Sequence, residues 1–401
     1  MRIDRRTFLK LMPGAFLDVG MHTGVLPLIT PGRKRARELG IRIGLMQPGR
    51  WNAITDVPGV KVGHCTIIRG SGPLKVGEGP VRTGITAIWP HENISNEYVP
   101  FGFHLLNGNG EVTGLLEAAT YGVLGHPICT TNTDSIGMVY DVMLEHFHST
   151  QSTLVPMVGE TWDAFLNDVA GRHVHAEHVL TALEGAVSGP VAEGCVGGGT
   201  GMICYNFKGG IGTASRRLPD LLARYTVGVL VQANHGLREL FCLDGVPVGQ
   251  EITDKRPEPD EASFLNSILM VIATDAPLRE DQLNRLAQRA AHGLAKTGSV
   301  SSNSSGDFAL AFSTGNKIKR EDFWNGKTFA LQAIEEFNIQ PFFQAVAEAT
   351  EEAILNALFM ATDMTGRDNH KVYALPIDRV LKIMSYYRRL LPQREKSVAS
   401  L

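Results

Sequence analysis

Serines and one aspartate crowd a stretch near the end of the chain, residues 298–308 (GSVSSNSSGDF). Asp307 directly precedes an apolar run, so its carboxylate is expected to be buried. It then needs a polar partner, because burying an unpaired charge is costly. A serine hydroxyl attacks a carbonyl efficiently only when a base takes its proton, and no Ser–His–Asp order stands out in the sequence. The stretch is therefore either a flexible serine-rich loop or part of a site for acyl chemistry.

An α-amino group is another base suited to such chemistry, since its reference pKa of about 7.7–8.0 lies near neutral pH. It becomes available beside a serine only where the backbone is cut in front of that serine. Residues 251–261 (EITDKRPEPDE) are mostly charged and include two prolines, which predicts an exposed, protease-accessible connection. They lead into an apolar strand predicted over 263–275, which contains Ser267. A cut before Ser267 is thus physically possible, although a linker between two domains has the same composition.

Motifs of other catalytic classes are missing. The sequence has no HExxH, GxxxxGK[ST], GxSxG or GxGxxG motif and no EF-hand loop. His173, His175 and His178 lack Asp or Cys at ligand spacing, which favours an exposed helix edge over a metal site. The five cysteines form no CxxC, and we interpret them as free thiols, with a catalytic pair of Cys65 and His64 left open. We expect neither a metal nor a cofactor.

Strands and helices alternate along the chain, and they must position these residues. Apolar or alternating runs predict further strands over 60–64, 83–88, 225–232 and 309–314. Helices are predicted over 112–121, 161–169, 283–294 and 343–362. Such an alternation is typical of a layered α/β protein in which helices cover sheets.

Composition and charge argue against a nucleic-acid-binding protein and a membrane-spanning protein. The chain has 401 residues, 43% hydrophobic and 20% charged, as expected for a soluble globular protein of one large or two ordinary domains. With 38 Lys+Arg against 41 Asp+Glu, it offers no positive field for nucleic acid. Beyond the N-terminus no uninterrupted apolar run approaches the length of about 18 residues that spans a bilayer. We therefore expect no nucleic-acid partner and no membrane span.

Residues 1–32 differ from the rest of the chain. DRRTFLK at 4–10 closely matches the twin-arginine export signature, and a weakly apolar stretch follows. Asp18 interrupts that stretch and no A-x-A cleavage site follows it, so the alternative is a basic, amphipathic N-terminus of a cytoplasmic protein. We expect residues 1–32 to be an export signal and the protein to be periplasmic.

Seven ordered motifs run through most of the chain. They are NAITDVPGV at 52–60, RTG at 82–84, NGNGE at 107–111, GTGM at 199–202, KGGIGTASR at 208–216, ATDAPL at 273–278 and GDF at 306–308. In these motifs the sequence resembles the β-aminopeptidase family, which includes the L-aminopeptidase/D-amidase-esterases. Members of that family are self-processing hydrolases with an N-terminal serine.

The resemblance implies a precursor that is cut between Asn266 and Ser267. The products would be an α chain of residues 33–266 and a β chain of residues 267–401, which stay together as one catalytic domain. Ser267 would be the nucleophile, and its freed amine the proton acceptor. The resemblance also implies an αββα sandwich of the kind shared with the ornithine acetyltransferases, and a homo-oligomer of αβ units.

The resemblance gives roles to five more residues. Ser305 and Asp307 match the serine and the acidic residue that orient and activate the nucleophile. Asn234 matches a side-chain amide donor to the oxyanion, an interaction worth ~3–4 kcal/mol in the transition state. Glu160 matches a carboxylate that holds the free amine of the substrate. Trp162 is a substrate-binding position at which family members have a tyrosine whose hydroxyl lies near the oxyanion, and an indole can donate a hydrogen bond but cannot accept or shuttle a proton.

We therefore expect an aminopeptidase or amidase that acts on short peptides, amides or esters with a free amine, through an acyl-enzyme on Ser267. One alternative is an acyltransferase that passes the same acyl group to an amine instead of water. The other is an uncut binding protein without catalytic activity. The size of the chain on a denaturing gel separates this last alternative from the two enzymes.

Overall fold

The computed structural model describes residues 32–148, 154–219, 222, 224–259 and 266–390. The predicted export signal, apart from its last residue, therefore lies outside the described residues. No helix of the described residues is long and apolar enough to cross a membrane.

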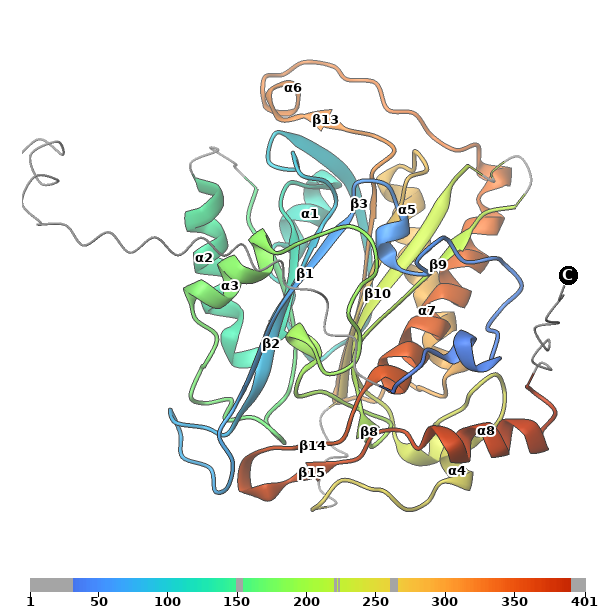
Figure 1. Ribbon diagram of the computed structural model, residues 1–401. Coiled ribbons are helices and arrows are strands. Elements are labelled where there is room, and N and C mark those ends of the chain that lie inside the picture. The colour runs from blue at the N-terminus through green and yellow to red at the C-terminus, as the bar shows by residue number, and fades with distance from the viewer. Residues whose placement is uncertain (1–31, 149–153, 220–221, 223, 260–265, 391–401) are drawn as a thin grey trace, which may run out of the picture.

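Two β-sheets lie face to face in the centre of the molecule (Figure 1). The small sheet has the order β1-β2-β5-β6 and consists of Lys61–Arg69, Val81–Trp89, Ile128–Asn132 and Met157–Thr161. The large sheet has the order β13-β3-β12-β11-β10-β9 and consists of Ile318–Lys319, Glu97–Gly108, Ser305–Ser313, Asn266–Thr274, Thr226–Asn234 and Gly210–Arg217, with β4 (Val123–Leu124) paired to β3. β11 and β12 are parallel neighbours, whereas β10 and β11 are antiparallel.

A helical layer covers the outer face of each sheet (Figure 1). Helices α2 (Ile136–His148) and α3 (Ala176–Glu184) pack on the small sheet, and α5 (Glu280–Lys296) and α7 (Gln340–Met360) pack on the large sheet. The predicted αββα sandwich is thereby confirmed. Smaller elements surround these layers: α1 (Leu115–Tyr121), α4 (Val248–Glu251), α6 (Arg320–Trp324), α8 (Ile377–Tyr386) and the hairpins β7–β8 (Ile203–Cys204, Phe207–Lys208) and β14–β15 (Met364–Thr365, Lys371–Val372).

The continuous apolar run of β11 follows from burial on both faces of the large sheet. Because side chains alternate along a strand, Ile268 and Met270 pack into the core beneath α5 and α7. Leu269 and Val271 pack into the core between the two sheets. By the same alternation, Ser267 belongs to the face that looks toward the small sheet.

Most predicted elements are present, but one prediction near the site is wrong. A helix was predicted over 161–169, whereas these residues form buried turns after β6 in which Asp163 O accepts hydrogen bonds from Leu166 N and Asn167 N, both at 3.1 Å. The turn does not continue into a helix, because Asp168 N donates to Pro80 O at 2.9 Å instead of to the carbonyl oxygen of Ala164. In the serine-rich stretch 298–308, the part from Ser305 onward belongs to β12 and is buried, which argues against a flexible loop there.

The charged connection of residues 251–261 is largely exposed where it is described, up to residue 259. It follows β10 and precedes β11, which are neighbours in the same sheet. The interpretation as a linker between two separate domains is therefore wrong. The connection is a surface excursion between two strands of one sheet.

Candidate active site

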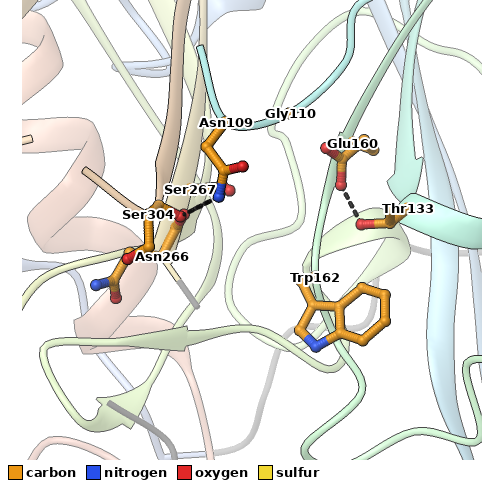
Figure 2. A pocket seen from close by; sticks show the side chains of 8 residues that line it. All are labelled: Asn109, Gly110, Thr133, Glu160, Trp162, Asn266, Ser267 and Ser304. Carbon is orange, nitrogen blue, oxygen red and sulfur yellow. Dashed lines mark hydrogen bonds between the residues drawn. The ribbon is translucent and has the colours of Figure 1, made fainter. Parts of the chain in front are cut away.

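A pocket of about 260 Å³ opens between the two sheets, where β11 begins and β6 ends (Figure 2). One wall carries Asn266 and Ser267 of β11, and the other carries Glu160 of β6 with the Trp162 indole below it. The remaining lining residues come from the ends of neighbouring strands, and they are Asn109, Gly110, Thr133 and Ser304. The fold thus brings four of the sequence-predicted residues to one cavity.

Ser267 is almost buried, with 6% of its surface exposed. Its hydroxyl Oγ donates a hydrogen bond to the carbonyl oxygen of Asn266 at 2.6 Å. The N–H of Gly306, its register partner on β12, donates to the same Oγ at 3.2 Å. The hydroxyl therefore lies against the carbonyl group that precedes it in the chain.

Ser305 and Asp307 form a buried pair on β12, in which Ser305 Oγ donates to Asp307 Oδ1 at 2.5 Å. Ser305 is the register partner of Asn266, so the pair flanks the peptide bond between Asn266 and Ser267. Burial raises the pKa of Asp307, and the hydroxyls of Ser305 and Ser301 offset only part of this effect. Within the described residues, the second oxygen of Asp307, Oδ2, is buried without a hydrogen-bond partner.

Glu160 presents a buried carboxylate on the opposite wall, with 4% of the residue exposed. Its Oε1 accepts a hydrogen bond from Glu111 N at 3.1 Å, and its Oε2 accepts one from the hydroxyl of Thr133. Burial is the largest cause that raises the pKa of Glu160, and the charges of Glu111 and Asp134 add to it. No lysine or arginine in the described part of the chain forms an ion pair with Glu160. Such a carboxylate is suited to binding a cationic group.

Asn234 ends β10 and is the register partner of Ser267. Its Oδ1 accepts a hydrogen bond from Ile203 N at 2.8 Å, and its Nδ2 donates to Trp162 O at 3.0 Å. The amide therefore fixes the backbone of Trp162, whose indole lines the pocket. Donation from Asn234 to an oxyanion stays a prediction.

Sequence reasoning missed Thr133, Asn109, Gly110 and Ser304 as lining residues. Asn109 and Gly110 stand in the NGNGE motif, and Thr133 stands in the polar stretch TNTDS of residues 131–135. The available signal was a cluster of small polar residues directly after an apolar strand. Because each stretch contains several small polar residues, the sequence does not show which of them face the pocket.

The other histidine and cysteine candidates lie elsewhere. His64 Nδ1 is 2.9 Å from the hydroxyl of Thr86, and burial lowers the pKa of His64 to about 4. His64 Nε2 has no hydrogen-bond partner within the described residues, and burial raises the pKa of the Cys65 thiol, so the two side chains do not form a reactive pair there. The prediction of an exposed helix edge is wrong for His173, which is buried and lies 2.7 Å from Asp168 Oδ2.

Comparisons with known proteins agree with this geometry. Peptidase family S58 matches residues 52–372. The β-peptidyl aminopeptidase BapA of Sphingosinicella xenopeptidilytica is 44% identical over 392 residues, which cover 90% of this chain and 96% of that protein. BapA of Sphingosinicella microcystinivorans is 42% identical over 371 residues, which cover 89% of this chain and 93% of that protein.

Two solved structures share the fold at similar levels of identity. A β-aminopeptidase from Burkholderia superposes with a TM-score of 0.82 and 45% identity, over 88% of this chain and 99% of that chain. The L-aminopeptidase D-Ala-esterase/amidase of Ochrobactrum anthropi superposes with a TM-score of 0.82 and 39% identity, over 89% of this chain and 99% of that chain. The latter is described as a prototype for the serine aminopeptidases and a new variant of the Ntn hydrolase fold.

Proposed function

The chain belongs to peptidase family S58, and on this premise we propose that it releases N-terminal amino acids from short peptides, amides or esters. One observation carries this function. The Ser267 hydroxyl and the buried carboxylate of Glu160, which has no cationic partner in the described residues, line the same pocket. A nucleophile and an anion that share a pocket suit a substrate whose free ammonium group lies close to the bond that is cleaved.

Maturation starts from the contact between the Ser267 hydroxyl and the Asn266 carbonyl. The hydroxyl oxygen attacks the carbonyl carbon of Asn266, the carbon–nitrogen bond to Ser267 breaks, and the proton passes to the departing nitrogen. The resulting ester is hydrolysed by water, which leaves a carboxylate on Asn266 and a free amine on Ser267. The products are an α chain ending at residue 266 and a β chain beginning at residue 267.

In the matured enzyme the neutral amine of Ser267 takes the proton of the hydroxyl, and the hydroxyl oxygen attacks the substrate carbonyl. Asn234 donates a hydrogen bond to the oxyanion of the tetrahedral intermediate. The leaving amine takes the proton and departs, and water then hydrolyses the acyl-enzyme. Asp307 Oδ2, which has no hydrogen-bond partner in the uncut chain within the described residues, accepts a hydrogen bond from the new α-amino group.

The substrate ammonium group binds to Glu160. Both carboxylate oxygens are already oriented by donors, Glu111 N and the hydroxyl of Thr133. A bound ammonium group supplies the cation that this carboxylate lacks, so substrates with a blocked amine bind poorly. This selectivity is what distinguishes an aminopeptidase from an endopeptidase.

The experiment combines intact mass spectrometry with an assay on L-alanyl and β-alanyl p-nitroanilides. We expect a β chain that begins at Ser267, release of p-nitroaniline, and loss of both in Ser267→Ala. An added amine acceptor tests the acyltransferase: aminolysis that is faster than hydrolysis would show that transfer is the main reaction. A single uncut chain without p-nitroaniline release would contradict the proposed function and support a binding protein.

We also propose that the protein is exported to the periplasm and assembles as a homo-oligomer of αβ units. The twin-arginine pattern at residues 4–10 supports export, and the likeness to the family supports assembly. Cell fractionation, the mass of the mature N-terminus and light scattering test these two points. A cytoplasmic protein with its first residues intact would contradict export, and a monomeric mass would contradict assembly.

A further inference from the structure

One segment, residues 107–112, crosses from the large sheet to the small sheet at the pocket. At its beginning Gly108 pairs with Gly306 of β12, the residue that donates to Ser267 Oγ. At its end Val112 forms a β-bridge with Gly159 of β6, directly before Glu160. The segment, called here the bridging segment, is therefore attached by its backbone to both walls of the pocket.

The beginning of the bridging segment is tied to the serine wall. Asn107 Nδ2 donates to the carbonyl oxygens of Ser302 and Ser305. Asn109 N donates to Ser305 O at 3.2 Å, and Asn109 Nδ2 donates to Ser304 O at 2.7 Å (Figure 2). These bonds attach the segment to the backbone that carries the Ser305–Asp307 pair.

The end of the bridging segment is tied to the carboxylate wall. Glu111 N donates to Glu160 Oε1 at 3.1 Å. Between the two attachments Gly110 has little room for a side chain, because an added Cβ atom would lie 2.8 Å from Glu160 Oε1 and 3.3 Å from the ring of Phe308. A Cβ atom on Gly306 would likewise lie 2.7 Å from Asn109 O. The segment is thus in tight contact with Glu160 and with the neighbour of Ser267.

We infer that the bridging segment fixes the distance between the Glu160 carboxylate and the Ser267 hydroxyl, and so selects aminoacyl groups by length. This inference rests on the proposed function, in which Glu160 binds the amine and Ser267 attacks the carbonyl. A β-amino acid has one more carbon between these groups than an α-amino acid, which displaces the carbonyl by roughly 1.5 Å. A misplacement of about 1 Å can lower the rate about a hundredfold. Asn109 and Gly110 are therefore positioning residues that determine specificity.

The test compares kcat/KM for L-alanyl and β-alanyl p-nitroanilides in each preparation. The ratio of the two values is independent of the fraction of matured enzyme, so incomplete processing does not affect it. We expect the wild type to prefer one substrate by about 10-fold or more, the usual range for one methylene group. Asn109→Ala loosens the tie to Ser304 and should bring the ratio to within roughly 3-fold of unity. The matched control Asn303→Ala, at an exposed asparagine of the adjacent loop, should keep the wild-type ratio.

A second variant acts on the other attachment. The methyl group of Gly110→Ala would lie 2.8 Å from Glu160 Oε1 and pushes this carboxylate away from the bridging segment, so the ratio should shift toward the longer β-alanyl substrate. A wild type without preference would overturn the inference. So would equal losses on both substrates in Asn109→Ala and Gly110→Ala. Failure of the wild type to hydrolyse either substrate would instead refute the proposed function itself.

Discussion

Two groups of buried carboxylates in this molecule differ in their charged partners and in the direction of their pKa shifts. In the first, here called the arginine–glutamate cluster, Arg216 of β9 contacts Glu348 at 3.0 Å and Glu352 at 2.7 Å, and Arg37 contacts Glu352 at 2.6 Å. Burial alone would raise the pKa values of both glutamates. Hydrogen bonds and the guanidinium charges outweigh burial and lower them.

The second group consists of two separate carboxylates, Glu160, which lines the pocket, and Asp307, which lies beside Ser305 on β12. Burial raises the pKa of each, and neither forms an ion pair with a lysine or arginine in the part of the chain that the structure describes. The difference indicates what each group does. The paired carboxylates hold α7 against β9 across the proposed cut, whereas the proposed function assigns the unpaired carboxylates to the substrate ammonium group and to the new amine of Ser267.

Glu352→Gln should cause the largest loss of stability. It leaves Arg216 and Arg37 without their shared carboxylate, and breaking a buried pair usually costs about 3–5 kcal/mol. Urea unfolding should be measured in the Ser267→Ala background, which keeps each protein uncut under the proposed mechanism. The matched control is Glu351→Gln, whose partner Lys296 is largely exposed, and about 1 kcal/mol or less is expected there. Glu351 is itself buried, so equal losses in the two variants would mean that the buried guanidinium partners of Glu352 add no stability.

Asp307→Asn should have the opposite effect to Glu352→Gln: we expect a loss of activity and no loss of stability. We expect kcat per matured enzyme to fall about 100- to 1000-fold, since the amine of Ser267 loses a charged hydrogen-bond acceptor. In the uncut background the variant should be at least as stable as its parent, because an unpaired buried charge has been removed. Asp275→Asn, just past the other end of β11, is the control and should keep its turnover. Normal turnover in Asp307→Asn would exclude Asp307 from the mechanism.

Glu160→Gln should weaken recognition of the free amine. A hydrogen bond to a charged group contributes about 1.5–3 kcal/mol, so kcat/KM for alanyl p-nitroanilide should fall roughly 10- to 100-fold. The variant keeps the shape of the side chain and its contact with Thr133. The preference for the free amine over the N-acetylated substrate should shrink by the same factor. If both substrates lost activity equally, Glu160 would be structural and would not be the amine anchor.

The layers of the fold could be predicted from the sequence because each depends on a long apolar pattern. The apolar run that includes Leu269 and Val271 required burial on both faces of a sheet, and the helix over 283–294 became part of α5. The turn after β6 was missed because apolar residues such as Leu166 are spaced as in a helix, while Asp168 N bonds to Pro80 O, which is distant in the sequence, and so ends the turn. Periodicity therefore predicted burial correctly there and backbone conformation wrongly.

The two walls of the pocket could be named from the sequence only through the resemblance to a family. Nothing in the spacing of Glu160 and Ser267 predicts that they share a cavity, because their strands lie in different sheets and meet only after folding. Gly110 carries even less signal, since its role is the space that it leaves beside Glu160. Contacts between sheets depend on three-dimensional packing, which a local pattern does not encode.

The smallest expected effect, and the sharpest test of the comparison, is the opposite dependence of the two groups on pH. Glu352 has a folded pKa below its usual 4.5, so it stabilises the protein above that value and loses this effect as the pH falls through the folded pKa. The loss of stability caused by Glu352→Gln should therefore shrink below about pH 5.

Asp307 has a folded pKa above its usual 3.8, so its ionisation destabilises the folded state increasingly as the pH rises from there. In the Ser267→Ala background, the melting temperature of Asp307→Asn relative to its parent should rise from pH 4 to pH 7, with roughly 2 °C for each kcal/mol. If the stability of both variants, relative to their parent, changed with pH in the same direction and by the same amount, the contrast between Glu352 and Asp307 would be refuted.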